Sequence, residues 1–586
     1  MEVWLQFRDY TMTETFQSRV SRGKRNGPDW IFAVGTSLLV SLLVVLPFFW
    51  LGSASGHDFE FHVASWLDVS YQWSEGTFYP RWTAWTNHRF GEPRYIFYPP
   101  LSWLMGAALA RVVPLPWLPM AFVLLAQTFA GISAFILLRH VAGRRGALFG
   151  AACYAANPNA LLISYVRSDF AEQLACAIFP LLLLGTLKLT KLLEPEVASG
   201  GATLLSFAIP FAAVWLANAP AGVIATYAMA LVIGWAGVSQ RSFGIILSGA
   251  AGIALGFGLT GFYLIPAAYE QRWVNIGEAL SSGLLPWENF LFTSINDVEH
   301  TWFNWIASIC AVVLMLLVFG LALLSRTFAK KDGFANGQRK LYNTLLVLAT
   351  GASFLMLRVS KPLWEHLPKL RFVQFPWRWM SVLAVVYVCF LAVLAQKRRG
   401  WLVAIFVLIL SVPLANFLIA NGWWDPDEMP MQQEAIVSGN GYEGTDEYDP
   451  LGDDHLDLPT NAPPVKVLTE ASGGAPVQDA QVQILQWKTE HRELEVRTKD
   501  RASLAVRLLN YPAWRIEVNG KRVSPERMDD INQMVIPVDR GFSLIEIRFV
   551  RTADRIVGDL VSGFSLGISG MILLLGKRKG PGRSVA

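Results

Sequence analysis

Charged side chains are scarce in this sequence. Only 16% of the 586 residues are charged and eight are histidine, whereas 53% are hydrophobic and the chain carries 23 Trp and 36 Phe. So small a charged fraction with so many apolar residues is not typical of a soluble globular protein. The composition therefore indicates a polytopic membrane protein, and we expect no nucleic-acid partner.

Cysteine is also rare. The chain has four, and all of them fall inside apolar runs: Cys153, Cys176, Cys310 and Cys389. A disulfide framework in the loops and a zinc site with paired cysteine spacing are therefore excluded, and we interpret these residues as small buried hydrophobic side chains.

Several common catalytic motifs are missing. The sequence has no GxxxxGK[ST] phosphate loop, no GxSxG nucleophile elbow and no HExxH zinc motif. These absences argue against ATP-driven and zinc-dependent chemistry. Any reaction here has to use a donor that is already activated.

Long apolar runs alternate with basic clusters along most of the chain. Runs of roughly 16 to 22 residues can cross, or nearly cross, a hydrocarbon core about 30 Å thick, and basic loops stay on the cytoplasmic side. Twelve crossings satisfy both conditions, at Trp30–Leu51, Trp117–Leu138, Ala147–Val166, Phe170–Leu187, Ala202–Ala217, Gly222–Val238, Phe243–Pro266, Trp305–Leu324, Leu341–Leu357, Trp379–Ala395, Trp401–Ala420 and Ile556–Leu575. Both chain ends are then cytoplasmic, and the first run is an uncleaved anchor, although "GSASG" after it keeps cleavage open.

This arrangement predicts five parts. They are a basic tail at 1–29, a multi-span domain at 30–421, a polar extracytoplasmic domain at 422–555, a last membrane helix at 556–576 and a basic tail at 577–586. The run "YPPLSWLMGAALARVV", residues 98–113, must not cross fully, because a crossing there would move most later basic clusters outside. We predict a half-span or interfacial helix at this position.

Ionisable residues gather in the loops assigned to the outer side, which are residues 52–116, 166–173, 267–300 and 359–377. "GHDFEFH" follows the first run, and "VRSDFAEQ" forms a short loop between two later runs. Close approach of their carboxylates could raise a pKa, bind a divalent cation or create a general base. The candidate catalytic residues are Asp58, Glu60, Asp169 and Glu172, with Asp58 and Asp169 as possible metal ligands. For any one of them, a solvated loop carboxylate is the simpler alternative.

Arginine and aromatic residues accompany these acids. Such side chains suit sugar stacking and phosphate binding, and they equally suit the headgroup belt of a membrane protein. The candidate substrate-binding residues are His57, His62, Arg81, Arg94, Tyr98, Arg167, Glu270, Arg272, Arg371, Gln374 and Arg378.

The polar domain changes character along its length. Residues 422–474 are acidic and rich in Gly and Pro, which favours a solvated loop over a Ca²⁺ site because the spacing is not that of an EF-hand. From Val482 on, the pattern has period two: Ile545, Ile547 and Phe549 alternate with charged residues, and "NG" at 519–520 signals a hairpin. A small antiparallel β-sandwich is predicted.

The ordered motifs "GHDFEFH", "YPRW", "FGEPRYIFYPPL", "YVRSDFAEQLA", "PAAYE", "QFPWRWM" and "GYEGTDEYDP" resemble two nested families. The broader one is the GT-C superfamily of membrane glycosyltransferases. The narrower one is the bacterial membrane family labelled "6-pyruvoyl-tetrahydropterin synthase-related", close to YfhO-like proteins, a label that does not imply pterin chemistry. The similarity runs from about residue 30 to 575.

The resemblance implies transfer of a sugar from a polyprenyl-phosphate carrier to a glycan, lipid or protein acceptor at the outer face of the bacterial cytoplasmic membrane. By position, Asp58 matches the first-loop acid of such enzymes, Asp169 and Glu172 match the second acidic motif, and Glu60 and His62 are further possible members. No cofactor is implied beyond a possible divalent cation.

Two other readings stay open. The chain could transport lipid-linked glycans across the membrane, although its runs are nearly free of ionisable residues at mid-span and show no internal repeat. It could also be a non-enzymatic scaffold for envelope assembly, in which the β-domain binds and the loop acids are vestigial.

Overall fold

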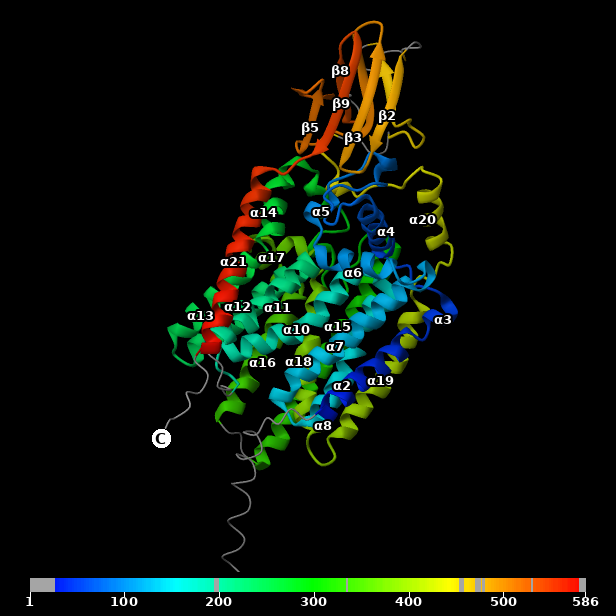
Figure 1. The fold of residues 1–586 in the computed structure, drawn as a ribbon. Helices are drawn as coiled ribbons and strands as arrows, with labels where there is room; N and C mark the ends of the chain where they lie inside the picture. Colours follow the sequence, from blue (N-terminus) through cyan, green and yellow to red (C-terminus); the bar gives the residue numbers. More distant parts are fainter. Residues whose placement is uncertain are drawn as a thin grey trace, which may run out of the picture.

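The computed structural model describes residues 27–193, 200–332, 336–452, 458–469, 476, 480–527 and 531–578. Within these ranges the chain forms a bundle of helices with a β-sandwich at one end (Figure 1). The predicted fold class, a polytopic helical protein with an antiparallel β-domain, is confirmed. Of the predicted basic tails, residues 1–26 and 579–586 lie outside the described residues, as do 453–457 and 470–474 of the acidic segment.

The α-helices follow one another along the chain as α2 (Gly27–Val45), α3 (Phe48–Leu51), α4 (Phe59–Glu75), α5 (Arg94–Phe97), α6 (Pro100–Ala110), α7 (Leu118–Val141), α8 (Arg144–Ala155), α9 (Pro158–Leu162), α10 (Phe170–Leu189), α11 (Gly200–Ala217), α12 (Ala219–Ser239), α13 (Phe243–Leu259), α14 (Gly261–Glu270), α15 (Val298–Asp332), α16 (Asn336–Leu355), α17 (Lys361–His366), α18 (Met380–Ala395), α19 (Trp401–Ala420), α20 (Glu428–Val437) and α21 (Ala553–Arg578). Single π or 3₁₀ turns join many of them, at η1 (Asn87–Arg89), η2 (Leu115–Trp117), the π turn η3 (Ile163–Arg167), η4 (Gln271–Trp273), η5 (Ile276–Leu280), η6 (Pro286–Glu288), η7 (Arg358–Ser360), η8 (Leu370–Val373), η9 (Pro376–Trp379) and η10 (Asp446–Tyr448).

Nine helices among the described residues are long and apolar enough to cross a membrane, and eleven spans result if each of two bent helix pairs counts as one. The bent pairs are α13 with α14, at 76°, and α16 with the segment that includes α17, at 89°. Twelve crossings were predicted, and the prediction is wrong at Ala147–Val166, which is not one helix. Pro158 lacks an N–H and starts a new helix, and the Asn157 side chain caps it by accepting from the N–H groups of Asn159 and Ala160.

The run predicted as a half-span contains the 11-residue apolar helix α6, which begins at Pro100. Eleven residues rise only about 16 Å, too little for a full crossing. A short helix at this position is therefore confirmed, and it packs against α4 and α7.

The β-sandwich consists of two antiparallel sheets, in the orders β1-β4-β8-β7 and β2-β3-β9-β5-β6. Its strands are β1 (Val465–Leu468), β2 (Gln481–Trp487), β3 (His491–Thr498), β4 (Ala502–Leu509), β5 (Trp514–Val518), β6 (Lys521–Val523), β7 (Glu526–Arg527), β8 (Gln533–Val538) and β9 (Gly541–Phe549). Leu504 and Ile536 of one sheet share a core with Val496 and Ile545 of the other. Residues 519–520 form the predicted hairpin turn, with φ of 50° and 76°.

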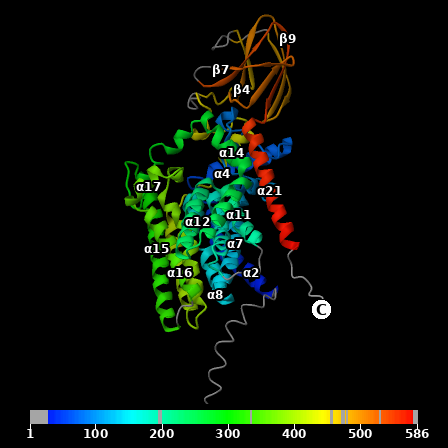
Figure 2. The ribbon, with the colours of Figure 1, turned by 90° about the vertical axis from the view of Figure 1, so that its left-hand side faces the viewer.

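One buried carboxylate ties the two parts of the molecule together. Helix α21 runs back from the sandwich along α13 and α14 (Figures 1 and 2). At its start, Arg555 Nε and Nη2 donate to the two oxygens of Glu270 at 2.7 and 2.8 Å, and the Tyr511 hydroxyl of the sandwich donates to Glu270 Oε2 at 2.6 Å. The base of the sandwich is thus held on the bundle by more than the chain connections.

Candidate active site

The two acidic motifs of the sequence touch each other in the folded chain. The Asp58 N–H donates to the carbonyl oxygen of Arg167 at 3.1 Å, and the Gly56 N–H donates to Ser168 Oγ at 3.1 Å. A Cβ atom on Gly56 would lie 2.1 Å from the carbonyl oxygen of Val166. Only glycine therefore allows the first loop to dock this closely on the turn η3.

Local backbone structure aims the second motif at the first. The π turn η3 ends at Arg167, and Ser168, its C-cap, takes the left-handed conformation with φ 57°. Asp169 follows as the N-cap of α10, and its Oδ1 accepts from the N–H of Glu172 at 2.8 Å. π turns are frequent at functional sites, and carboxylates are favoured at helix N-termini.

Arg167 lies at the centre of the cluster. A single nitrogen, Nη2, is 3.1 Å from Asp58 Oδ2 and 3.1 Å from Asp169 Oδ2, while Nη1 binds Glu172. The guanidinium thus bridges the first-loop acid and the second acidic motif.

Arg378 supplies a second guanidinium from the turn η9, just before α18. Its Nε is 3.1 Å from Glu172 Oε2 and its Nη2 is 3.5 Å from Asp169 Oδ2. Aromatic rings of the motif "QFPWRWM" pack on both cations: the guanidinium carbon of Arg167 is 4.8 Å from the Trp377 ring centroid, and that of Arg378 is 5.0 Å from the Phe375 centroid. Cation–π contacts of this kind help to hold a cation away from water.

Asp58 differs from the other members of the cluster in its exposure. Its side chain is 38% exposed, whereas those of Arg167, Asp169, Glu172 and Arg378 are 3–6% exposed. Three carboxylates face two guanidiniums, so the cluster carries one excess negative charge when all three carboxylates are ionised and His62 is neutral. Asp58 is therefore the carboxylate of the cluster that a ligand can contact from solvent.

Asp169 is held in its ionised form. Burial opposes its ionisation, but the adjacent His62 ring, whose Nε2 lies 3.4 Å from Oδ1, and the charges of Arg167 and Arg378 together lower its pKa well below the ordinary value.

The structure therefore brings together seven of the predicted site residues, namely Asp58, His62, Tyr98, Arg167, Asp169, Glu172 and Arg378. Two more lie at the edge of this group. Gln374 Oε1 is 3.5 Å from Arg378 Nη1, and the exposed His57 ring packs against Trp423 at a centroid distance of 4.7 Å.

Three predicted residues are in buried or partly buried contacts elsewhere. Arg94 is buried and pairs with Glu92 at 2.6 Å. Glu270 is fully buried in the contact with Arg555. Arg81 stacks on Tyr79, 4.4 Å from its ring centroid.

The other three predicted residues are exposed. Glu60 is on the solvent side of α4. Arg272 stacks on Tyr269, at 3.8 Å from the ring centroid, and Arg371 packs on Phe372, at 5.6 Å. The structure does not bring Glu60 into the Arg167 cluster.

Sequence reasoning missed two kinds of residue. Ser168 donates through Oγ to the carbonyl oxygen of Ala54 at 2.7 Å and so fastens the two motifs; its place inside "RSD" was the available signal. Asp68 is buried in α4, where it accepts from the Ala84 N–H at 2.9 Å, and burial raises its pKa to about 7. No motif marks Asp68.

The predicted metal ligands Asp58 and Asp169 do not fit a cation in this arrangement. Among the described residues, no group of three His, Cys, Asp or Glu side chains could hold a metal ion. Arg167 Nη2 already lies between the two carboxylates, where a shared cation would sit.

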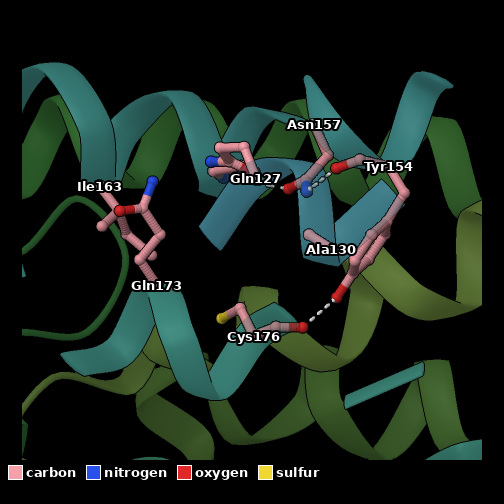
Figure 3. A pocket seen from close by; sticks show the side chains of 8 residues that line it. Gln127, Ala130, Tyr154, Asn157, Ile163, Gln173 and Cys176 are labelled. Atoms are coloured by element: carbon pink, nitrogen blue, oxygen red, sulfur yellow. Dashed lines mark hydrogen bonds between the residues drawn. The ribbon is translucent and has the colours of Figure 1, made fainter. Parts of the chain in front are cut away.

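A small cavity lies inside the bundle, lined by residues of α7, α8, α9 and α10 and of the turns that join them (Figure 3). It has a volume of ≈ 10 Å³ and is lined by Gln127, Ala130, Tyr154, Asn157, Ala160, Ile163, Gln173 and Cys176. In this cavity the Tyr154 hydroxyl donates to the carbonyl oxygen of Cys176 at 2.6 Å. The volume is about that of one water and far too small for a sugar.

Among known proteins, similarity is found to solved structures. No family model and no curated protein matches the chain. The structure is similar to the crystal structure of the Archaeoglobus fulgidus oligosaccharyltransferase in complex with Zn and sulfate, with a TM-score of 0.40 and 15% sequence identity. The match covers 72% of this chain and 58% of the archaeal chain.

Proposed function

We propose that this chain is an integral-membrane glycosyltransferase of the GT-C type, which moves a sugar from a polyprenyl-phosphate carrier to an acceptor. The proposal rests on one observation. Asp58 is partly exposed, and the buried Arg167 bridges it to Asp169 of the second acidic motif. Membership of the narrower YfhO-like family, and catalysis on the outer face of a bacterial cytoplasmic membrane, belong to the same proposal.

In the proposed reaction, an acceptor hydroxyl oxygen forms a bond to the anomeric carbon of the donor sugar. The bond from that carbon to the phosphate oxygen breaks, and the electron pair leaves with the lipid phosphate. Asp58 accepts the hydroxyl proton, as a general base within hydrogen-bond reach of the acceptor. The excess negative charge of the cluster also favours the positive charge that develops on the sugar ring.

Exposed cations on neighbouring loops suit the leaving phosphate. Arg272 and Arg371 extend from the turns η4 and η8, and Lys369 Nζ donates to Gln271 Oε1 at 3.2 Å, which joins the two loops. The second loop continues to Arg378 of the cluster within nine residues of Lys369. Guanidinium and ammonium groups bind phosphate well, and among the described residues none of these three forms a buried ion pair with a carboxylate.

We infer that Arg167 supplies the positive charge that a divalent cation would otherwise provide between Asp58 and Asp169. Sugar transfer should then persist in EDTA. A requirement for Mg²⁺ or Mn²⁺ would mean that Arg167 moves aside during the reaction.

The test is sugar transfer by the purified full chain, supplied with a panel of polyprenyl-phosphate sugars and with extracted envelope glycans or lipids as acceptors. The expected result is a new glycosidic product formed in step with release of the lipid phosphate. Movement of lipid-linked sugar across a vesicle membrane without a new glycosidic bond would instead indicate transport. If the folded protein shows neither transfer nor transport, the result would favour a non-enzymatic scaffold.

A further inference from the structure

A polar pocket lies at the opposite end of α4 from Asp58. The helix is 17 residues long, so its two ends are roughly 25 Å apart. The pocket has a volume of ≈ 40 Å³ and is lined by Tyr71, Glu75, Ala84, Trp85, Arg89, Pro464, Trp487, Thr489, Arg492 and Arg507. These residues come from the end of α4, from the first loop and from the adjoining strands of the β-sandwich.

Three arginines line this pocket against one carboxylate. Arg507 is buried, and it donates to the backbone carbonyl oxygens of His88, Ala462 and Thr460 at 2.8, 2.9 and 3.1 Å. Arg89 Nη1 donates to the Gly439 carbonyl oxygen at 3.4 Å. Carbonyl oxygens satisfy these donors without neutralising them, so the pocket keeps its excess of positive charge.

The third arginine, Arg492, has two nitrogens without a hydrogen-bond partner among the described residues. It is only 4% exposed, and among the described residues its Nε and Nη1 have no hydrogen-bond partner. Its guanidinium carbon lies between two indole rings, 5.0 Å from the Trp487 centroid and 5.3 Å from that of Trp514. Burial lowers the pKa of Arg492 to about 9, so it stays charged at neutral pH.

Glu75, the carboxylate in the pocket lining, is already engaged. Its Oε2 accepts from the N–H and the Oγ1 of Thr489 at 3.0 and 2.8 Å. A buried guanidinium whose N–H groups lack acceptors is unfavourable unless an anion binds it. The pocket therefore presents a buried guanidinium that an anion can bind.

Aromatic rings surround the same space. Trp85 and Trp487 line it, and Tyr71, 40% exposed, stands at its edge with its ring centroid 5.0 Å from that of Trp85. Rings of this kind stack on the apolar faces of sugars, which a bare inorganic anion does not need.

We propose that this pocket binds the carboxylate or phosphate group of an acidic saccharide, with Arg492 as its main partner and the sugar ring against Tyr71. The site lies apart from the Asp58 cluster and does not depend on sugar transfer. Its occupant would bridge α4 and the β-sandwich.

The test is ligand binding to the full chain in detergent micelles at constant ionic strength, read by tryptophan fluorescence and by thermal unfolding. The probes are glucuronate, glucose 6-phosphate, inorganic phosphate and neutral glucose. We expect glucuronate, glucose 6-phosphate or both to bind at least tenfold more tightly than glucose and more tightly than inorganic phosphate. The stronger of the two identifies the acidic group.

Three variants complete the test. Arg492→Gln should weaken binding at least tenfold without lowering the melting temperature of the ligand-free protein, because it removes an unpartnered buried charge. Arg89→Gln, at a half-buried position, should also weaken binding, and Arg522→Gln, exposed on β6, should not. The proposal is overturned if glucuronate and glucose 6-phosphate both bind no better than glucose or inorganic phosphate. It is also overturned if Arg492→Gln and Arg89→Gln bind these two sugars as the wild type does.

Discussion

At the scale of single residues, the candidate active site depends on how two buried arginines divide their charge among three carboxylates. Arg167 contacts all three, whereas Arg378 contacts only Asp169 and Glu172. Among the described residues, Asp58 thus has one ion-pair partner, and its side chain is partly open to solvent. The same contacts make Arg167 the residue whose loss leaves the most charge unpaired.

Replacement of Arg167 should therefore destabilise the folded protein strongly. In Arg167→Gln, two buried carboxylates lose a charged partner, and we expect the free energy of unfolding to fall by roughly 3–5 kcal/mol. Chemical denaturation in micelles measures this. Arg272→Gln is the matched control: Arg272 is exposed, and a change within about 0.5 kcal/mol is expected. Equal stability of the two variants would contradict the account of the cluster.

The lowered pKa of Asp169 predicts how stability depends on pH. The ordinary pKa is 3.8 and the folded value lies below it, so the stabilisation is fully present above about pH 4 and is lost as the pH falls through the folded pKa. Thermal unfolding between about pH 2 and pH 7 should show the onset of this loss below about pH 4. Asp169→Asn should melt at a lower temperature at pH 7 and show a weaker pH dependence. An unchanged dependence in the variant would assign the acid sensitivity to other groups.

At the scale of elements, the site is made where the first loop meets the turn between α9 and α10. This contact was not predictable from the apolar runs, because Ala147–Val166 has the composition of one span. "NPN" at 157–159 ends one helix and caps the next, and the π turn that follows turns Arg167 and Asp169 toward Asp58. Local capping chemistry here outweighs hydrophobic length.

The close contact at Gly56 can be tested directly. In Gly56→Ala the new methyl group would lie 2.1 Å from a backbone oxygen, which has no side-chain freedom to yield. The loop would have to move from η3, and we expect a loss of roughly 1–3 kcal/mol of stability together with reduced sugar transfer. Gly35→Ala in α2, where nothing lies within 4 Å of the added Cβ, should lose neither. Full activity and stability in Gly56→Ala would contradict this contact.

At the scale of the whole molecule, Glu270, Arg555 and Tyr511 form one of the contacts that fix the β-sandwich on the bundle. Glu270→Gln should weaken this attachment more than Tyr511→Phe, because it removes the charge that buried Arg555 needs, whereas Tyr511→Phe removes one hydrogen bond worth roughly 1.5–3 kcal/mol. Limited proteolysis near residue 550 should be fastest in Glu270→Gln. Cleavage of both variants at the wild-type rate would mean that other contacts hold the sandwich.

The β-sandwich was more predictable from the sequence than the candidate active site. The β-sandwich followed from period two and from Asn519-Gly520, because those signals are local. The site was only partly predictable, because ion pairs between residues far apart in the chain depend on the tertiary fold. Glu270 and Arg272 illustrate this: two positions apart, one is fully buried against Arg555 and the other is exposed on Tyr269.

The most direct test of the proposed glycosyltransferase activity is the sugar-transfer rate of Asp58→Asn, measured on protein shown by chromatography and thermal unfolding to be folded. Asp58 is half-exposed, so the variant should fold, while loss of the base should lower the rate by roughly 10²–10⁴-fold. Asp427→Asn, the same change at an exposed position on another loop, should transfer at the wild-type rate. Transfer by folded Asp58→Asn at the wild-type rate would contradict the account.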